Sequence, residues 1–294
     1  MNPIRLLLGI WLCCFCVTLQ AQTAPTTNGL YAQFNTSKGT FYCNLRYDLV
    51  PRTVANFVGL AEGSKAWLNY SNGALSSRPF YSGIIFHRVV SNFVVQAGSP
   101  NGVGNDDPGY HIHNEIAAGL NHNTAGVLAM ANSGGTNSNG SQFYVTLSPQ
   151  TALNGKYTVF GSVVSGMNVV TNIGAVAIDS GDKPITPVVI NSVTILRIGT
   201  AASNFNVAAV SPPLPVPRFK TAQVTRLPPN VQLQWIGTTN SEYRVCYSGD
   251  LKHWQGSFLG SYTGPSSTLL FTSLNSFVSS VKQQHFFLVE SALD

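Results

Sequence analysis

The stretch GIIFHRVVSNFVVQAGSP, residues 83–100, decides the fold. Its first half alternates with the period of two that is typical of a β-strand, and it then runs into a turn. This alternation places Ile84, Phe86 and Arg88 on one face. An arginine among apolar neighbours has two interpretations: its stem packs at the rim of a barrel with the charge in water, or its guanidinium serves a site. The pattern alone favours the first interpretation.

The composition is that of a chain that buries a large core. Of its 294 residues, 44% are hydrophobic and only 9% are charged, and the length suits one large domain or two ordinary ones. The net charge of +5 comes from 16 Lys and Arg against 11 Asp and Glu, and no stretch gathers the basic residues into a stripe. We therefore expect no nucleic acid among the partners of this protein.

Residues 1–21 have the layout of a secretory signal peptide: one positive charge, a short apolar run and a small residue at Ala21. The apolar run is shorter than the roughly 20 residues that cross a bilayer, which disfavours a retained anchor. A lipoprotein is a second alternative because of Cys13, Cys14 and Cys16, but none of them follows a pair of small residues. We expect cleavage after Ala21, no membrane span in the mature chain, and an exported protein that is periplasmic or secreted.

The mature chain retains Cys43 and Cys246, which make neither a disulfide framework nor a zinc motif. Three histidines are close in sequence, His111, His113 and His122, but no carboxylate or cysteine completes a convincing set of metal ligands. We therefore expect neither a metal nor a cofactor.

Residues 28–200 alternate apolar strands with glycine-rich turns and contain two helical patterns. The helices are predicted over residues 52–63, where Gly63 is the stop signal, and over residues 165–176. A polar loop is expected over residues 64–79. Many strands and two helices predict a mainly β domain, a closed β-barrel whose open ends the helices cover.

A change of composition separates residues 218–294 from this domain. Residues 201–217 carry four prolines between Pro212 and Pro217 and predict a semi-rigid linker. Beyond it, short alternating strands predict a small antiparallel β-sandwich, which is either an inert spacer or a contact to a surface, a polysaccharide or a partner protein. Four aromatic residues are either a sugar platform or the core of this sandwich: Trp235, Tyr243, Tyr247 and Trp254.

Four segments carry a resemblance to a known family: FHRVVSNFVVQAGSP, AGVLAMANSGGTNSNGSQFYVTL, LNGKYTVFGSVVSGMNVV and GDKPITPVVINSVTI. In this order they resemble the cyclophilin family of peptidyl-prolyl cis-trans isomerases, over roughly residues 30–199. The resemblance implies an eight-stranded closed cyclophilin-like β-barrel with two capping helices, and an enzyme that acts on proline-containing polypeptides. The tail resembles, more loosely, fibronectin type III-like modules of secreted bacterial proteins. No pattern of an oligomer interface stands out, so we expect a monomer.

The resemblance also implies a peptide-binding groove on one face of the barrel. Arg88 matches the catalytic arginine of the family, and Gln96 and Phe93 are assigned to the catalytic group with it. Gln96 is expected to bond the substrate backbone, and Asn132 to hold the extended peptide through its own backbone. The positions that match substrate-binding residues are Val94, Ala131, Asn132, Gln142, Tyr144, Leu153 and Tyr157.

A few positions depart from the family pattern. Ala152 stands where the best-known eukaryotic members carry a tryptophan that contacts cyclosporin, so tight cyclosporin binding is not expected. Val94 and Tyr144 stand where methionine and phenylalanine are common, and both keep the proline pocket apolar. Tyr157 stands where many members carry a histidine.

Rotation about an X-Pro bond needs no nucleophile, because no bond is made or cleaved. Its barrier of about 18–20 kcal/mol comes from amide resonance. A guanidinium aimed at the prolyl nitrogen or the adjacent carbonyl stabilises the twisted amide more than the planar one. Arginine suits this role because it is always protonated and its fork of donors is rigid. The alternative function is a non-catalytic peptide-binding or adhesion protein that uses the groove or the C-terminal module to hold a partner.

Overall fold

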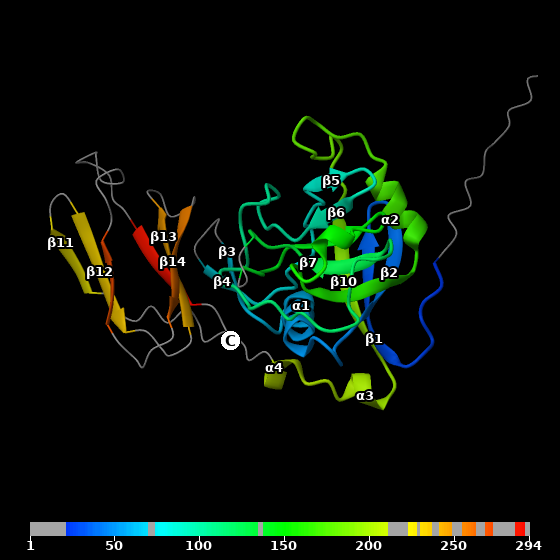
Figure 1. The fold of residues 1–294 in the computed structure, drawn as a ribbon, viewed down its shortest axis with the longest axis horizontal. Helices are drawn as coiled ribbons and strands as arrows, with labels where there is room; N and C mark the ends of the chain where they lie inside the picture. Colours follow the sequence, from blue (N-terminus) through cyan, green and yellow to red (C-terminus); the bar gives the residue numbers. More distant parts are fainter. Residues whose placement is uncertain are drawn as a thin grey trace, which may run out of the picture.

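The computed structural model describes residues 22–69, 74–134 and 138–210, and beyond them the backbone of six strands between Gln223 and Ser291. The main body is an antiparallel sheet of eight strands in the order β10-β1-β2-β9-β7-β8-β6-β5 (Figure 1). Its strands are β1 (Gly29–Thr36), β2 (Gly39–Leu45), β5 (Arg88–Val90), β6 (Val94–Ala97), β7 (Val127–Met130), β8 (Phe143–Thr146), β9 (Val159–Ser165) and β10 (Ile190–Ile198).

The two edges of the sheet meet through residues just before β5 and residues just before and at the start of β10. The N–H of Phe86 donates to the carbonyl of Val188 at 2.9 Å, and the N–H of Ile190 donates to the carbonyl of Ile84 at 2.8 Å. The predicted mainly β architecture of eight strands is confirmed, but as a curled sheet rather than the predicted closed barrel. Within the described residues, the two edges of the curled sheet are joined only by this short contact, because β5 and β10 themselves form no ladder.

Two helices confirm the two helical patterns of this domain: α1 (Pro51–Glu62) and α2 (Met167–Gly174). Figure 1 shows them on different sides of the sheet. Their apolar residues nevertheless enter one core with the inner face of the sheet, since Phe57 of α1 and Ile173 of α2 are both fully buried in it. None of the helices in the described residues is long and apolar enough to cross a membrane.

Aromatic rings fill the inside of the curled sheet. Phe34 and Phe41, on the neighbouring strands β1 and β2, stack with their centroids 4.6 Å apart. Phe57 of α1 meets Phe143 of β8 edge to face, with ring centroids 5.9 Å apart. Its ring is tilted against that of Phe160 of β9, with centroids 5.3 Å apart. Each such ring stabilises the fold by about 1.5–3 kcal/mol through burial. One side chain of α1 therefore links strands from both halves of the sheet.

The first turn of α1 is capped by a residue far away in the sequence. Val50 offers no capping side chain, and Pro51 stands at the first helical position. Glu115 replaces the local cap: its carboxylate accepts the N–H of Thr53 at 2.5 Å, the hydroxyl of Thr53 at 2.6 Å and the N–H of Arg52 at 3.2 Å. A carboxylate at a helix N-terminus satisfies free donors and complements the helix dipole. This contact ties the loop before β7 to the helix.

The predicted polar loop over residues 64–79 contains a short hairpin. β3 (Trp67–Asn69) and β4 (Ala74–Ser76) pair within it. The indole N–H of Trp67 donates to the carbonyl of Arg78 at 3.0 Å, and the ring is 4% exposed. Because the neighbouring residues in the sequence are mostly polar, the pattern did not predict that this tryptophan is buried and anchors the loop.

The chain beyond β10 departs from the predicted linker over residues 201–217. α3 (Thr200–Ser203) and α4 (Val207–Val210) lie in its first half. Between them Phe205 packs on Tyr47 with ring centroids 5.2 Å apart. Few bulky residues occur in this stretch, so its pattern did not indicate that it packs on the domain. The proline-rich part, residues 211–217, lies outside the described residues.

The C-terminal region contains two antiparallel three-stranded sheets, β11-β12-β15 and β14-β13-β16. Their strands are β11 (Gln223–Leu227), β12 (Asn230–Ile236), β13 (Ser241–Ser248), β14 (Gln255–Tyr262), β15 (Thr268–Thr272) and β16 (Phe286–Ser291). Strands thus lie where the sequence placed them, and their assembly into a sandwich stays a prediction.

The distant cap of α1 yields a stability prediction. Glu115→Ala removes the acceptor of three donors, so we expect the free energy of unfolding to fall by about 1–2 kcal/mol. Glu115→Gln retains an acceptor oxygen and should lose less. Urea unfolding of the three proteins measures the difference; equal stability of the alanine variant and the wild type would contradict the capping role.

Candidate active site

One row of residues runs across five adjacent strands on the outer face of the sheet. Arg88 of β5 pairs with Gln96 of β6, which pairs with Tyr144 of β8. Tyr144 pairs in turn with Ala129 of β7, and Ala129 with Val159 of β9. Residues that are directly paired across strands point to the same face. Strand register alone therefore places the predicted catalytic Arg88 and Gln96 beside the predicted pocket residue Tyr144.

The break before β5 corrects one expectation about Arg88. The sequence pattern placed Arg88 on the face of Phe86, but Phe86 is fully buried in the inner core and Arg88 is not. Residues 84–86 bond to the chain before and at the start of β10, whereas β5 pairs with β6. Because the chain changes its partner between them, the pleat is not continuous, and Val89 takes the inward position.

A second apolar cluster, separate from the inner core, surrounds this row. Its buried members are Val94, Val127, Ala129, Tyr144 and Val159, and its partly buried members are Phe93, Leu120, Ala131, Leu153 and Tyr157. The structure thus brings together the five apolar and aromatic residues that were predicted to bind substrate and Phe93, which was predicted to belong to the catalytic group. It adds Val127, Ala129 and Val159, which lie in buried strands where the sequence carries no sign of which face a residue occupies, and Leu120, which lies in the loop before β7. Ala152 is exposed on the short helix Thr151–Leu153 beside them.

Arg88 stands at the rim of this outer cluster with its charge accessible. Its side chain is 40% exposed, and its Nε lies 3.5 Å from a carboxylate oxygen of Asp182. The guanidinium carbon is 5.9 Å from the centre of the Phe93 ring, within cation–π distance. A cation therefore borders an apolar pocket without being buried in it.

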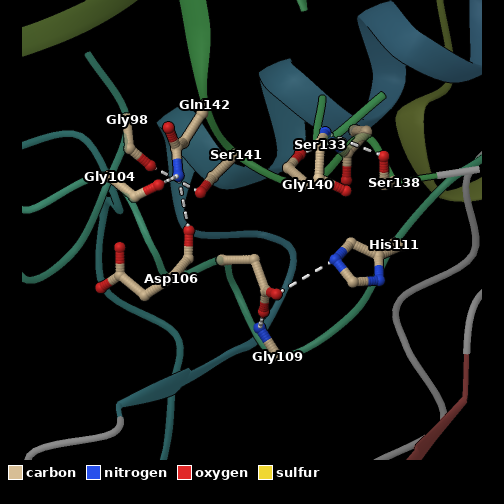
Figure 2. Close-up of polar contacts among 12 residues, drawn as sticks. Gly98, Gly104, Asp106, Gly109, His111, Ser133, Ser138, Gly140, Ser141 and Gln142 are labelled. Carbon is tan, nitrogen blue, oxygen red and sulfur yellow. Dashed lines mark hydrogen bonds and ion pairs between the residues drawn. The ribbon is translucent and has the colours of Figure 1, made fainter. Parts of the chain in front are cut away.

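Two glutamines form a polar border next to Arg88, and their orientation is fixed. The amide nitrogen of Gln142 donates to the carbonyls of Gly104 at 3.1 Å and Asp106 at 2.8 Å (Figure 2). Its oxygen accepts the amide of Gln96 at 3.0 Å. The side-chain oxygen of Gln96 has no partner among the described residues, so it is an acceptor that a bound peptide N–H can reach.

The opposite border of the pocket offers backbone groups. The N–H and carbonyl of Asn132 make no hydrogen bond to any residue in the described part of the chain. The Asn132 side chain is engaged instead, since it donates to the carbonyl of Lys156 at 3.4 Å and accepts the N–H of Gly134 at 3.0 Å. A free N–H and C=O on one residue can pair with an extended peptide as a neighbouring strand does.

His122 is a residue of the pocket that sequence reasoning considered only as a metal ligand. It is fully buried, and its Nε2 lies 3.0 Å from the hydroxyl of Tyr144. Its Nδ1 lies 3.2 Å from the acceptor oxygen of Asn154, so Nδ1 carries the proton and Nε2 accepts from Tyr144. Burial lowers the pKa of His122 and raises that of Tyr144, which keeps both neutral. His111 pairs elsewhere, with Asp107 at 3.0 Å (Figure 2).

His87, the neighbour of Arg88, is buried beside Gly104, where a Cβ on the glycine would lie 3.0 Å from the imidazole ring. It is 6% exposed, and neither ring nitrogen forms a hydrogen bond to a described residue. Burial, together with the charges of Arg88 and Lys183, lowers its pKa to about 4, against the opposing effect of the Gln142 side chain. His87 is therefore neutral near pH 7.

These features define a class of site: an apolar pocket with a cation at one rim and peptide-pairing backbone at the other. The family of cyclophilin type peptidyl-prolyl cis-trans isomerases matches residues 31–195. A probable peptidyl-prolyl cis-trans isomerase A of Mycobacterium leprae is 42% identical over 166 residues, 56% of this chain and 91% of that protein. A peptidyl-prolyl cis-trans isomerase-like 1 of Aspergillus fumigatus is 41% identical over 169 residues, 56% of this chain and 95% of that protein.

Comparison with a solved structure also indicates a cyclophilin fold. A cyclophilin type peptidyl-prolyl cis-trans isomerase of Cryptosporidium parvum is similar with a TM-score of 0.50 and 26% identity, covering 57% of this chain and 98% of that one. The chain belongs to the cyclophilin family of peptidyl-prolyl cis-trans isomerases, enzymes that work without a cofactor. Residues 196–294 lie outside the family match.

The burial of His87 yields a pH prediction. Its pKa is about 4 in the folded chain and about 6.5 when unfolded, so the unfolded chain binds the proton first as the pH falls. Stability contributed by the neutral ring is intact above pH 7 and is lost between about pH 6.5 and pH 4. The wild type should therefore lose about 2 kcal/mol more unfolding free energy than His87→Gln between pH 7.5 and pH 4.5. Urea unfolding of both proteins at the two pH values measures this difference. If the wild type and His87→Gln lose the same unfolding free energy, this assignment is contradicted.

Proposed function

We propose that this protein accelerates the cis/trans isomerisation of X-Pro bonds in exported polypeptides and so assists their folding. The observation that carries the proposal is the row across β5, β6 and β8, which sets Arg88, Gln96 and Tyr144 side by side over the outer apolar cluster. The names of the relatives from Mycobacterium leprae and Aspergillus fumigatus support the reaction.

The apolar cluster is the part of the site that holds the proline ring. Tyr144 and Tyr157 meet edge to face with centroids 5.9 Å apart, and Tyr144 is fixed from behind by His122. A ring held against fixed side chains stays still while the other half of the amide turns. The hydroxyl of Tyr144 is occupied by His122, so it adds no unsatisfied polar group to the pocket.

The peptide on either side of the proline is held by hydrogen bonds that do not change as the amide twists. Gln96 presents its acceptor oxygen because Gln142 fixes its amide group. Asn132 presents a backbone donor and acceptor at the other border. Binding of this kind orients the X-Pro bond towards Arg88.

Arg88 is the group that lowers the barrier. In the twisted amide the prolyl nitrogen regains a lone pair and becomes an acceptor, and a guanidinium donor stabilises this state more than the planar one. A hundred-thousandfold acceleration requires about 7 kcal/mol of such differential stabilisation. A cation at the border of an apolar pocket acts in a lower effective dielectric than in water, which strengthens its contribution.

Export and the C-terminal module belong to the same proposal. The signal-peptide pattern of residues 1–21, which lie outside the described residues, supports export to the periplasm or the medium. The chain changes between the two C-terminal sheets after β12, β14 and β15, an order that is typical of Greek-key sandwiches. Such a module would attach the enzyme to a surface, a polysaccharide or a partner protein.

The test of the catalytic role is a substitution at Arg88. We expect Arg88→Ala to lower kcat/KM for an X-Pro test peptide by about 100-fold, because the cation that lies beside Phe93 at the pocket rim is lost. Arg88→Lys should also lose activity, since an ammonium lacks the rigid fork of donors. Arg46→Ala, which removes a half-exposed arginine paired with Asp48 elsewhere, is the matched control.

Two results would contradict the proposal. Unchanged kcat/KM in a folded Arg88→Ala variant would remove Arg88 from the mechanism. No acceleration by a folded wild type would leave a cyclophilin-shaped protein that only binds peptides.

A further inference from the structure

A tight turn, residues 179–183, lies directly beside Arg88 and has no part in the predicted groove. Asp179 holds it together: its side-chain oxygen accepts the N–H groups of Gly181 at 2.8 Å and Lys183 at 3.0 Å. Asp182 adopts a left-handed backbone with φ of +63°. Aspartate and asparagine tolerate this conformation better than other non-glycine residues. The turn therefore presents one particular side chain, that of Asp182, in a fixed direction.

Asp182 contacts β5 through both its backbone and its side chain. Its carbonyl accepts the N–H of Val89 at 2.8 Å. Its carboxylate lies 3.5 Å from the Nε of Arg88. Because β5 is an edge strand of only three residues, its free edge would otherwise expose unpaired backbone groups. The turn thus completes the edge of β5 and meets the arginine at the same point.

The edge of the guanidinium that faces Asp182 determines which N–H donors of Arg88 remain available to a substrate. The carboxylate approaches the Nε edge, while the ring of Phe93 lies 5.9 Å from the guanidinium carbon. The two terminal amino groups of Arg88 have no hydrogen-bond partner among the described residues. A planar guanidinium held along one edge presents its remaining donors in a fixed direction.

We propose that Asp182 is a positioning residue for Arg88: its carboxylate holds the Nε edge so that the terminal amino groups face the twisted amide. This inference rests on the proposed function. Both side chains are about 40% exposed, so the ion pair contributes little to stability, and its value lies in orientation.

The experiment compares two charge-removing variants of the full chain. Asp182→Asn keeps the left-handed backbone and the carbonyl that bonds Val89, and removes only the charge beside Arg88. Asp48→Asn is the matched control, since it removes the charge from another exposed Arg–Asp pair, outside the site. We expect Asp182→Asn to lower kcat for an X-Pro peptide about tenfold with little change in KM, and Asp48→Asn to leave kcat unchanged.

A double substitution separates positioning from a structural effect. If Asp182 acts through Arg88, adding Asp182→Asn to Arg88→Ala should lower the residual rate no further. The NMR signal of the Arg88 Nε–H should also shift in Asp182→Asn while the urea midpoint is unchanged.

Three outcomes would overturn the inference. In an active wild type, an unchanged kcat in Asp182→Asn, or a further tenfold loss in the Arg88→Ala background, would remove only the positioning role. An inactive wild type would overturn the proposed function and this inference together.

Discussion

The candidate site depends on the register of the strand ladders. Arg88, Gln96, Tyr144, Ala129 and Val159 are neighbours only because four consecutive ladders pair them. A slip of one residue in β6 would turn Gln96 into the core and expose Val95, because side chains alternate between the two faces. Burying an amide without partners and exposing a valine both raise the free energy of the folded state. Stability of the core therefore also fixes the geometry of the site.

The inner face of the sheet forms the core of the domain, and the outer face forms the candidate binding pocket. The inner face is closed by rings such as Phe34 and Phe143 and is fully buried, so it fixes the curvature. The outer face carries a smaller cluster with partly exposed members, which leaves apolar surface for a ligand. Arg88 stays 40% exposed at the border, where its charge keeps most of its hydration and still faces apolar side chains. The polar groups behind the pocket, His122 and Gln142, have their hydrogen bonds within the protein.

The sequence predicted this arrangement where a pattern or a motif spans a whole element. The strands, α1, α2 and the named pocket residues follow from alternation, helical spacing and family motifs. Prediction from the sequence failed where residues from distant parts of the chain contact each other. The break in the pleat before Arg88, the cap of α1 by Glu115 and the Tyr144–His122 bond each depend on tertiary contacts that leave no local pattern. The packing of Phe205 on Tyr47 was missed for the same reason.

We propose above all that the outer face of strands β5 to β9 binds an X-Pro segment and accelerates rotation about its prolyl bond. Exchange NMR of a proline-containing peptide with a small amount of the wild-type protein tests it most directly. We expect cross-peaks between the cis and trans forms within a second, whereas the free peptide interconverts over tens to hundreds of seconds. In the labelled protein, shifts should concentrate at Gln96, Asn132 and Tyr144. Exchange no faster than in free peptide, or shifts confined to other surfaces, would contradict it.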